Sequence, residues 1–181
     1  MNVPKSIFRQ YDVRGLVDRE LTPEFARALG RAFGSVAYER MGRAPVIAVG
    51  RDNRPSGDAL SRGIRKGITE AGGTAIDVGM LPTPALYYAV SALGTDGGLQ
   101  VTGSHNPPEF NGFKMVLAGE AFHGDEILGL WEIIMAEQWR SGAGKEASDG
   151  SVLQRYRGAI ISHHKLERPV RVVVDCGNGV G

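Results

Sequence analysis

The sequence has little cysteine, no long apolar run and no excess of charge of either sign. Cys176 is the single cysteine among 181 residues, so no disulfide can form within the chain. Because Cys176 follows the valine-rich run 170–174, we expect it to be a small buried apolar side chain without chemistry of its own. A packed core must therefore stabilise the chain, and 181 residues with 42% hydrophobic side chains are enough to build one.

The charge balance argues against a polyanionic partner. Lysine and arginine number 21 and aspartate and glutamate 20, which gives a formal net charge of +1. Such a chain has no long-range field that would attract nucleic acid or an anionic membrane. The N-terminus lacks an apolar signal segment, and Asp77, Pro82 and Pro84 interrupt the most apolar later stretch. We therefore expect a cytoplasmic protein without nucleic-acid or membrane partners, and any anion that it binds must be captured by local groups.

Helix and strand patterns alternate along the chain. Apolar spacing predicts helices over 23–41, 57–71, 84–93, 127–135 and 152–164, and strands over 46–49, 74–78, 98–102, 113–116 and 170–174. Thr22, Ser56 and Thr83 are the predicted helix N-caps. This alternation predicts an α/β fold with a mixed, mostly parallel sheet sandwiched between helices. In such sheets ligands bind at the carboxyl ends of the strands.

The last part of the chain predicts a domain boundary. The polar, glycine-rich stretch 140–151 is typical of a surface loop. Val170–Val174 predicts a new buried strand, which leads into a glycine-rich turn and no helix. A strand and a turn cannot form a domain alone. We therefore expect 1–168 to be one domain and 169–181 to be the start of a truncated second domain of a longer protein.

The run VTGSHNPPEFNGFK at 101–114 concentrates hydroxyl, imidazole, amide and ammonium groups just beyond a predicted strand. Gly103 removes bulk beside Ser104, so that a phosphate can approach the backbone. Two consecutive prolines stiffen the loop, and we expect Asn111 and Gly112 to form a positive-φ turn. Rigid donors around a transferring phosphoryl group are the main protein contribution to phosphotransfer. The alternative interpretation is that the polar triplet after Gly103 merely forms a turn.

The same run closely resembles the phosphoserine loop of the α-D-phosphohexomutase family, in particular its phosphomannomutase/phosphoglucomutase branch. The amino-sugar branch typically has S-A-S-H-N-P in this loop, and T-G-S-H-N-P here favours a hexose substrate. Further segments match the family in order, namely FRQYDVRG at 8–15, VGRDNRPSG at 49–57, GMLPTPALYYA at 79–89 and DCGNGVG at 175–181. The resemblance implies the fold of the family's first domain.

The resemblance also implies an intramolecular phosphotransferase, which interconverts hexose 1-phosphate and 6-phosphate through a phosphoserine and a hexose 1,6-bisphosphate intermediate. Ser104 would carry the phosphate, and its phosphate oxygen would be this domain's one Mg²⁺ ligand. Lys114 or His105 would assist proton transfer, with His105 favoured in a supporting role. The remaining implied site residues are Arg14, which would offset phosphate charge, and Tyr11 and Asn106, which would face the substrate.

The family's metal loop and its sugar-selecting loops have no counterpart in this sequence. No D-x-D-x-D run or His/Cys cluster occurs in it, so these residues cannot complete a Mg²⁺ site. The resemblance thus implies hexose phosphates and the missing C-terminal domains as partners, and an isolated chain without turnover.

Two alternatives remain open for the chain and two for one segment. The chain could be a non-catalytic sugar-phosphate binding module, or less favourably a serine hydrolase, since it lacks a G-x-S-x-G elbow and an evident third acid. Arg51 and Asp52 either face the site or form a structural ion pair that braces the loop.

Overall fold

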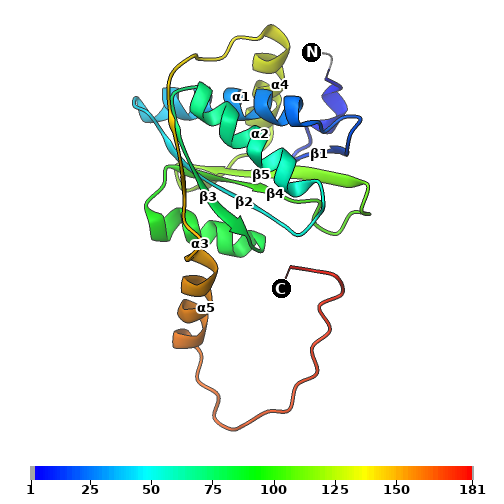
Figure 1. The fold of residues 1–181 in the computed structure, drawn as a ribbon, viewed down its shortest axis with the longest axis vertical. Coiled ribbons are helices and arrows are strands. Elements are labelled where there is room, and N and C mark those ends of the chain that lie inside the picture. Colours follow the sequence, from blue (N-terminus) through cyan, green and yellow to red (C-terminus); the bar gives the residue numbers. More distant parts are fainter. Residues whose placement is uncertain (1–2, 181) are drawn as a thin grey trace.

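The computed structural model describes residues 3–180, which form a mixed sheet between two layers of helices (Figure 1). The strands are β1 (Val13–Leu16), β2 (Val46–Arg51), β3 (Thr74–Met80), β4 (Gly97–Val101), β5 (Phe110–Leu117), β6 (Glu120–Ala121) and β7 (Lys145–Ser148). The helices are the 3₁₀ turn η1 (Lys5–Ile7) and α1 (Pro23–Met41), α2 (Gly57–Glu70), α3 (Thr83–Leu93), α4 (Asp125–Ala136) and α5 (Val152–His163).

The strand order is β1-β5-β4-β2-β3-β7, and β6 pairs with β5. The strands β2, β3, β4 and β7 run parallel to their neighbours in that group. β5 is antiparallel to β1, β4 and β6. The predicted mixed α/β sheet is thereby confirmed.

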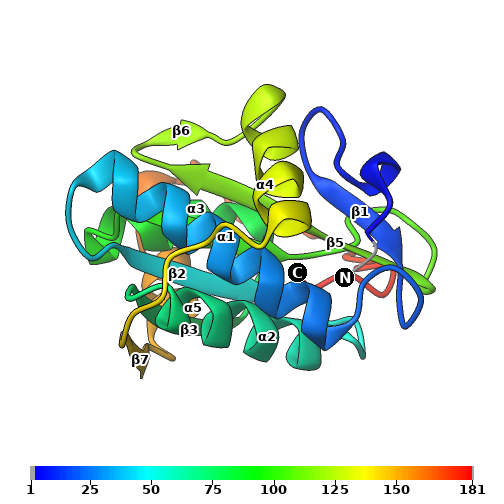
Figure 2. The same ribbon diagram turned by 90° about the horizontal axis from the view of Figure 1, so that it is seen from above.

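Each face of the sheet has its own hydrophobic core. α1, α2 and α4 cover one face, where Phe25, Phe33 and Ile64 pack among buried strand residues. α3 and α5 cover the other face, where Leu86 and Val152 pack with buried residues of β2 and β3. Seen from above, α1, α2 and α4 lie across the same side of the sheet (Figure 2). Within residues 3–180, no helix is long and apolar enough to cross a membrane.

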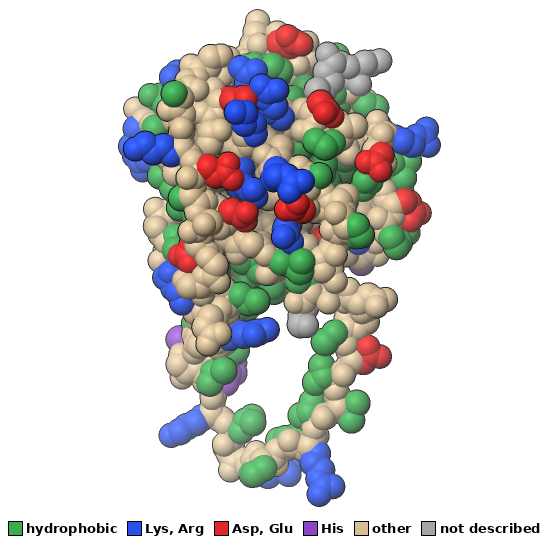
Figure 3. Space-filling model, viewed as in Figure 1, with side chains coloured by type: hydrophobic (Ala, Val, Ile, Leu, Met, Phe, Trp, Pro, Cys, Tyr) green, Lys and Arg blue, Asp and Glu red, His purple; other side chains and the backbone are tan. Residues whose placement is uncertain are grey.

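α1 and α2 touch at their backbones because glycines face the neighbouring helix. A Cβ atom on Gly67 would lie 2.1 Å from the carbonyl oxygen of Arg27, and one on Gly30 would lie 2.3 Å from that of Ile64. The guanidinium of Arg27 also donates two hydrogen bonds of 2.7 Å to Glu70 across the two helices. Figure 3 shows basic and acidic side chains interspersed over this helical face. The two helices thus form a close-packed layer that holds one side of the sheet.

The predicted N-cap positions of Thr22 and Ser56 are confirmed, whereas the one predicted at Thr83 is wrong. The Thr22 hydroxyl accepts a 3.1 Å hydrogen bond from the backbone N–H of Phe25. The Ser56 side chain makes no capping bond, and its hydroxyl accepts a 2.8 Å hydrogen bond from the Asn111 side chain. Thr83 is the first residue of α3, and the proline before it occupies the cap position.

Three predictions for the C-terminal part are also wrong. The predicted surface loop 140–151 contains β7, whose side chains are exposed and polar because it is an edge strand beside β3. The predicted buried strand Val170–Val174 is not a strand, and its Val173 is 98% exposed. Cys176, predicted to be buried, is exposed as well. This segment pairs with no strand within residues 3–180, so neither ladder hydrogen bonds nor a facing layer can bury it.

The helix contact generates a stability prediction. Gly67→Ala forces a methyl group against a backbone carbonyl, so we expect it to lower the free energy of unfolding by about 1–3 kcal/mol. Gly158→Ala in α5 is the matched control, since a Cβ there meets no atom within 4 Å and alanine favours a helix by about 0.5–1 kcal/mol. Urea unfolding of both variants measures the difference. Equal effects of the two substitutions would show that the helices do not depend on backbone contact.

Candidate functional site

The candidate site lies at the carboxyl edge of the parallel strands. Arg51 at the end of β2 is in register with Val101 at the end of β4, so the loops after these strands start side by side. Together with the loop after β3 and the turn at 177–180, they line a cavity of about 670 Å³. Ligands bind at this edge in parallel α/β sheets. The predicted phosphate loop therefore lies where the fold offers a ligand site.

Ser104 has a left-handed backbone conformation, with a φ of 53°. For a residue with a Cβ this conformation costs about 1 kcal/mol, so neighbouring contacts must hold it. Its backbone N–H donates a 2.9 Å hydrogen bond to Thr102 Oγ1, and its exposed Oγ lies 3.3 Å from His105 Nδ1. The positive-φ turn predicted at Asn111 and Gly112 is wrong, because both residues belong to β5 and neither has a positive φ.

A buried carboxylate holds the start of the loop. Asp52 Oδ2 accepts a 2.8 Å hydrogen bond from Thr102 Oγ1 and a 3.1 Å bond from the Gly103 N–H. Its side chain is only 12% exposed. Asp52 therefore joins the loop after β2 to the loop after β4.

The partner of Asp52 is Arg54, whose Nε lies 3.3 Å from Asp52 Oδ2. The ion pair considered between Arg51 and Asp52 is therefore not the one that forms, and Arg51 Nε lies 3.9 Å from Asp58 instead. Of the two alternatives for this segment, the bracing role is the one that the contacts of Asp52 fit.

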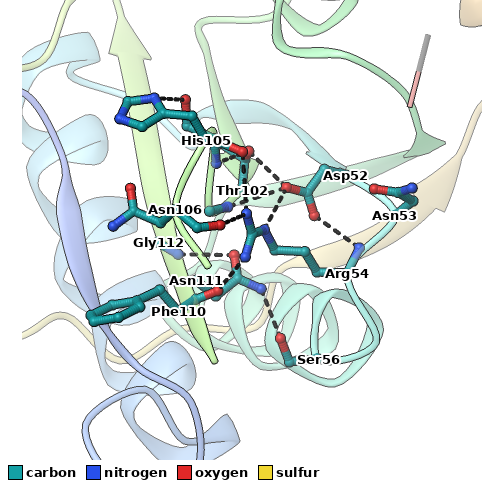
Figure 4. Close-up of polar contacts among 12 residues, drawn as sticks. Asp52, Asn53, Arg54, Ser56, Thr102, His105, Asn106, Phe110, Asn111 and Gly112 are labelled. Atoms are coloured by element: carbon teal, nitrogen blue, oxygen red, sulfur yellow. Dashed lines mark hydrogen bonds and ion pairs between the residues drawn. The ribbon is translucent and has the colours of Figure 1, made fainter. Parts of the chain in front are cut away.

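The guanidinium of Arg54 reaches under the Ser104 loop (Figure 4). Its two terminal nitrogens donate hydrogen bonds of 2.6–3.2 Å to four backbone carbonyls, those of Ser104, Asn106, Pro107 and Phe110. A Cβ atom on Gly103 would lie 2.1 Å from Arg54 Cζ. The bare glycine beside the serine therefore makes room for this guanidinium.

Arg14 holds the same loop from β1. Its Nη1 donates to the carbonyl of Gly103 and, over 2.7 Å, to the side-chain oxygen of Asn106. Its Nη2 pairs with Asp12, and the side chain is 5% exposed. Its buried Nε has no hydrogen-bond partner among residues 3–180. The structure thus brings Arg14 and Asn106 into direct contact.

Lys114 and Tyr11 are the two remaining predicted site residues. Lys114 Nζ is 3.4 Å from Asp12 Oδ2, the oxygen that also accepts from Arg14, and its side chain is 28% exposed. Tyr11, in the segment before β1, is 72% exposed. The structure therefore connects Lys114 to Arg14 through one carboxylate, while the Tyr11 ring lies at the surface.

Sequence reasoning missed Asp12 and Arg54 as members of this site. Both lie in segments that match the family, FRQYDVRG and VGRDNRPSG, in which the predicted residues were Tyr11, Arg14, Arg51 and Asp52. The position of Arg54 just after β2, the strand beside β4, was the available signal. Polar residues that follow neighbouring parallel strands meet at one edge of the sheet.

Comparisons with known proteins agree on one family. Residues 5–141 match the family described as phosphoglucomutase/phosphomannomutase, alpha/beta/alpha domain I. A phosphomannomutase/phosphoglucomutase of Pseudomonas aeruginosa is 46% identical over 178 residues, which are 98% of this chain and 38% of that protein. A phosphoglucomutase of Neisseria meningitidis is 40% identical over 182 residues, which are 99% of this chain and 39% of that protein.

A solved structure gives the same result. The crystal structure of a phosphoglucomutase/phosphomannomutase family protein from Burkholderia thailandensis superimposes with a TM-score of 0.86 at 39% identity, over 93% of this chain and 38% of that one. The chain therefore spans about two-fifths of the length of these relatives.

The left-handed serine generates a prediction about stability. Ser104→Gly relieves the backbone strain, so we expect it to raise the free energy of unfolding by about 1 kcal/mol relative to Ser104→Ala, which keeps the strain. Both substitutions remove the same hydroxyl, so the difference between them isolates the backbone. Thermal or urea unfolding of the two variants provides the comparison. An alanine variant as stable as the glycine variant would mean that the loop carries no strain at this residue.

Proposed function

The chain belongs to the phosphoglucomutase/phosphomannomutase family, and from this premise we propose that it is the phosphate-carrying first domain of an intramolecular phosphotransferase. The full-length protein would interconvert hexose 1-phosphate and hexose 6-phosphate through a hexose 1,6-bisphosphate. The observation that carries this proposal is the exposed Ser104 hydroxyl, which a buried hydrogen-bonded network presents at the edge of a cavity.

In the proposed reaction Ser104 gives and takes back a phosphoryl group. A sugar hydroxyl attacks the phosphorus of phosphoserine, the bond from phosphorus to Ser104 Oγ breaks, and a proton passes from the attacking hydroxyl to the departing serine oxygen. His105 Nδ1, 3.3 Å from that oxygen, can carry the proton at the serine side. Lys114 is the second candidate, and Tyr11 and Asn106 are proposed to face the sugar phosphate.

Charge around the loop favours a bound phosphate. Asp12 and Asp52 are two carboxylates, whereas Arg14, Arg54 and Lys114 are three cations in contact with them. The network therefore retains one positive charge beneath a site that must accept a dianion. In this proposal Arg14 acts on the phosphate indirectly. Its guanidinium orients the Gly103 carbonyl and the Asn106 side-chain amide.

A divalent metal fits the described residues only in part. Among residues 3–180 no three His, Cys, Asp or Glu side chains gather where they could hold a metal ion, and Asp52 is committed to four hydrogen bonds. The phosphate on Ser104 would be this chain's ligand for Mg²⁺, with the others in the C-terminal domains. When bound, the metal would offset the charge of the transferring phosphoryl group.

We place the end of this domain near Arg168, so that 1–168 form the first domain and 169–181 begin the next. Support comes from the apolar side chains of 170–174, which lie exposed in the loop that follows α5 and would need a further layer to cover them (Figures 1 and 3). The last residue of this segment, Gly181, lies outside the described residues.

The central prediction concerns phosphate on the serine. Incubation of the full-length protein with hexose 1,6-bisphosphate should add one phosphate, which peptide mapping by mass spectrometry places on Ser104. Ser104→Ala should lose this phosphate and lower kcat at least about a thousandfold, because the covalent carrier is gone. Ser162→Ala, an exposed serine of α5, serves as the control and should change neither. Stable phosphate on another residue, or an active Ser104→Ala protein, would refute the proposal.

A second prediction concerns the 181-residue chain alone. Because the metal ligands and sugar-selecting groups are proposed to lie in other domains, we expect no measurable mutase turnover from it and only weak binding of glucose 6-phosphate. A coupled assay for glucose 6-phosphate formation and a calorimetric titration provide the two measurements. Turnover by the isolated chain would contradict the proposed division of the site. Tight binding without turnover would favour a sugar-phosphate binding module.

A further inference from the structure

Every N–H donor of the Arg54 guanidinium is used within the protein. A guanidinium has five N–H groups. The single donor on Nε faces Asp52, and the four donors on the terminal nitrogens match the four loop carbonyls described above. Because no donor is left over for a ligand, Arg54 lines the cavity without being free to bind a phosphate there.

Four carbonyl oxygens that converge on one point repel each other unless a cation lies between them. Each oxygen is the negative end of a peptide dipole, and a backbone that turned these oxygens towards the cavity would oppose a phosphate there. Arg54 draws the oxygens of Ser104, Asn106, Pro107 and Phe110 to one side of the loop. The guanidinium thereby keeps four negative dipole ends turned towards itself.

The pair of Arg54 and Asp52 also grips Ser104 at both of its peptide groups. On the N-terminal side, Asp52 accepts from the Thr102 hydroxyl, which in turn accepts from the Ser104 N–H. On the C-terminal side, Arg54 Nη2 donates to the Ser104 carbonyl over 3.2 Å. One buried ion pair therefore fixes both ends of the residue whose left-handed conformation needs external support.

We propose that Arg54, held by Asp52, is the positioning residue of this site: its guanidinium sets the one loop conformation in which Ser104 Oγ faces the cavity. This inference rests on the proposed function, because it assigns Arg54 to the phosphate-carrying loop. It makes Arg54 a residue that acts through Ser104, in contrast to one that contacts the substrate.

The proposal depends on the planar shape of the guanidinium as well as on its charge. A lysine has three donors at a single point and cannot reach four carbonyls and a carboxylate in one plane. Arg54→Lys thus keeps the charge and much of the side-chain volume but loses the planar set of N–H donors. Arg62→Lys in α2 is the matched control, because Arg62 is 61% exposed and pairs with Asp58 on the surface.

The first arm of the test measures the loop in the 181-residue chain. Hydrogen–deuterium exchange followed by mass spectrometry reports the amide protection of 102–112, with the α5 segment as an internal reference. We expect Arg54→Lys to speed amide exchange in 102–112 at least about tenfold and to leave the exchange rate of α5 unchanged. The reason is that loss of the guanidinium frees the loop locally. Arg62→Lys should change neither segment. Unchanged protection of 102–112 in a folded Arg54→Lys protein would overturn the proposal.

The second arm measures catalysis in the full-length protein. Displacement of a reacting atom by about 1 Å can cost about 100-fold in rate, so we expect Arg54→Lys to lower kcat by about 10- to 100-fold. KM for the hexose phosphate should stay within about threefold, because Arg54 does not touch the substrate. A large rise in KM at constant kcat would overturn the assignment, since it would make Arg54 a substrate-binding group. Faster loop exchange with an unchanged kcat would overturn it too.

Two further results keep the test decisive. If Arg54→Lys does not fold, Arg54→Ala is assayed with added guanidinium ion, which should restore kcat saturably where ammonium does not; no such rescue would overturn the proposal. If the wild-type full-length protein shows no mutase activity, the proposed function fails. The exchange arm still decides whether Arg54 positions the loop, so the two failures are distinguishable.

Discussion

The ion pair between Asp52 and Arg54 connects the sheet to the chemistry of the site. The two residues lie just beyond β2, and through Thr102 and Gly103 they hold the loop beyond β4. Burying these charges carries a desolvation penalty, which close hydrogen bonds on both sides offset. The sheet sets where the loops after β2 and β4 begin. The Asp52–Arg54 pair sets the path of the loop after β4. A substitution of Asp52 or Arg54 would therefore alter the conformation of Ser104 through the loop.

The loop has a second support, which comes from a different strand. Arg14 reaches it from β1, a strand antiparallel to β5, and binds Gly103 and Asn106. The Ser104 loop is thus held by two guanidinium groups, one from β1 and one from the segment just after β2. Each guanidinium has its own aspartate, so the positive charge is distributed and does not collect at one point. In the proposed function, this arrangement would let a short loop accept a phosphate dianion while its backbone stays ordered.

Much of the fold follows from local patterns, and the site follows only in part. The alternation of apolar helices and strands predicted the layered sheet, because burial sets both periodicities. β7 escaped prediction because its side chains are polar and only its backbone pairs with β3. The comparisons confirm the family, whereas the role of Ser104 stays a prediction from the resemblance. The contacts of Arg54 depend on which strands are neighbours, and a linear pattern does not contain that information.

The strands at the two ends of the Ser104 loop, β4 and β5, pair with each other. Arg54 and Arg14 also hydrogen-bond to the loop. A serine held in this way cannot travel between two distant positions. In the proposed phosphate transfer between the two ends of a sugar, the sugar itself would then be the moving part. The bisphosphate would have to turn over, presenting first one end and then the other to a stationary oxygen. A stiff loop at Ser104 would therefore require the bisphosphate intermediate to be mobile within the site.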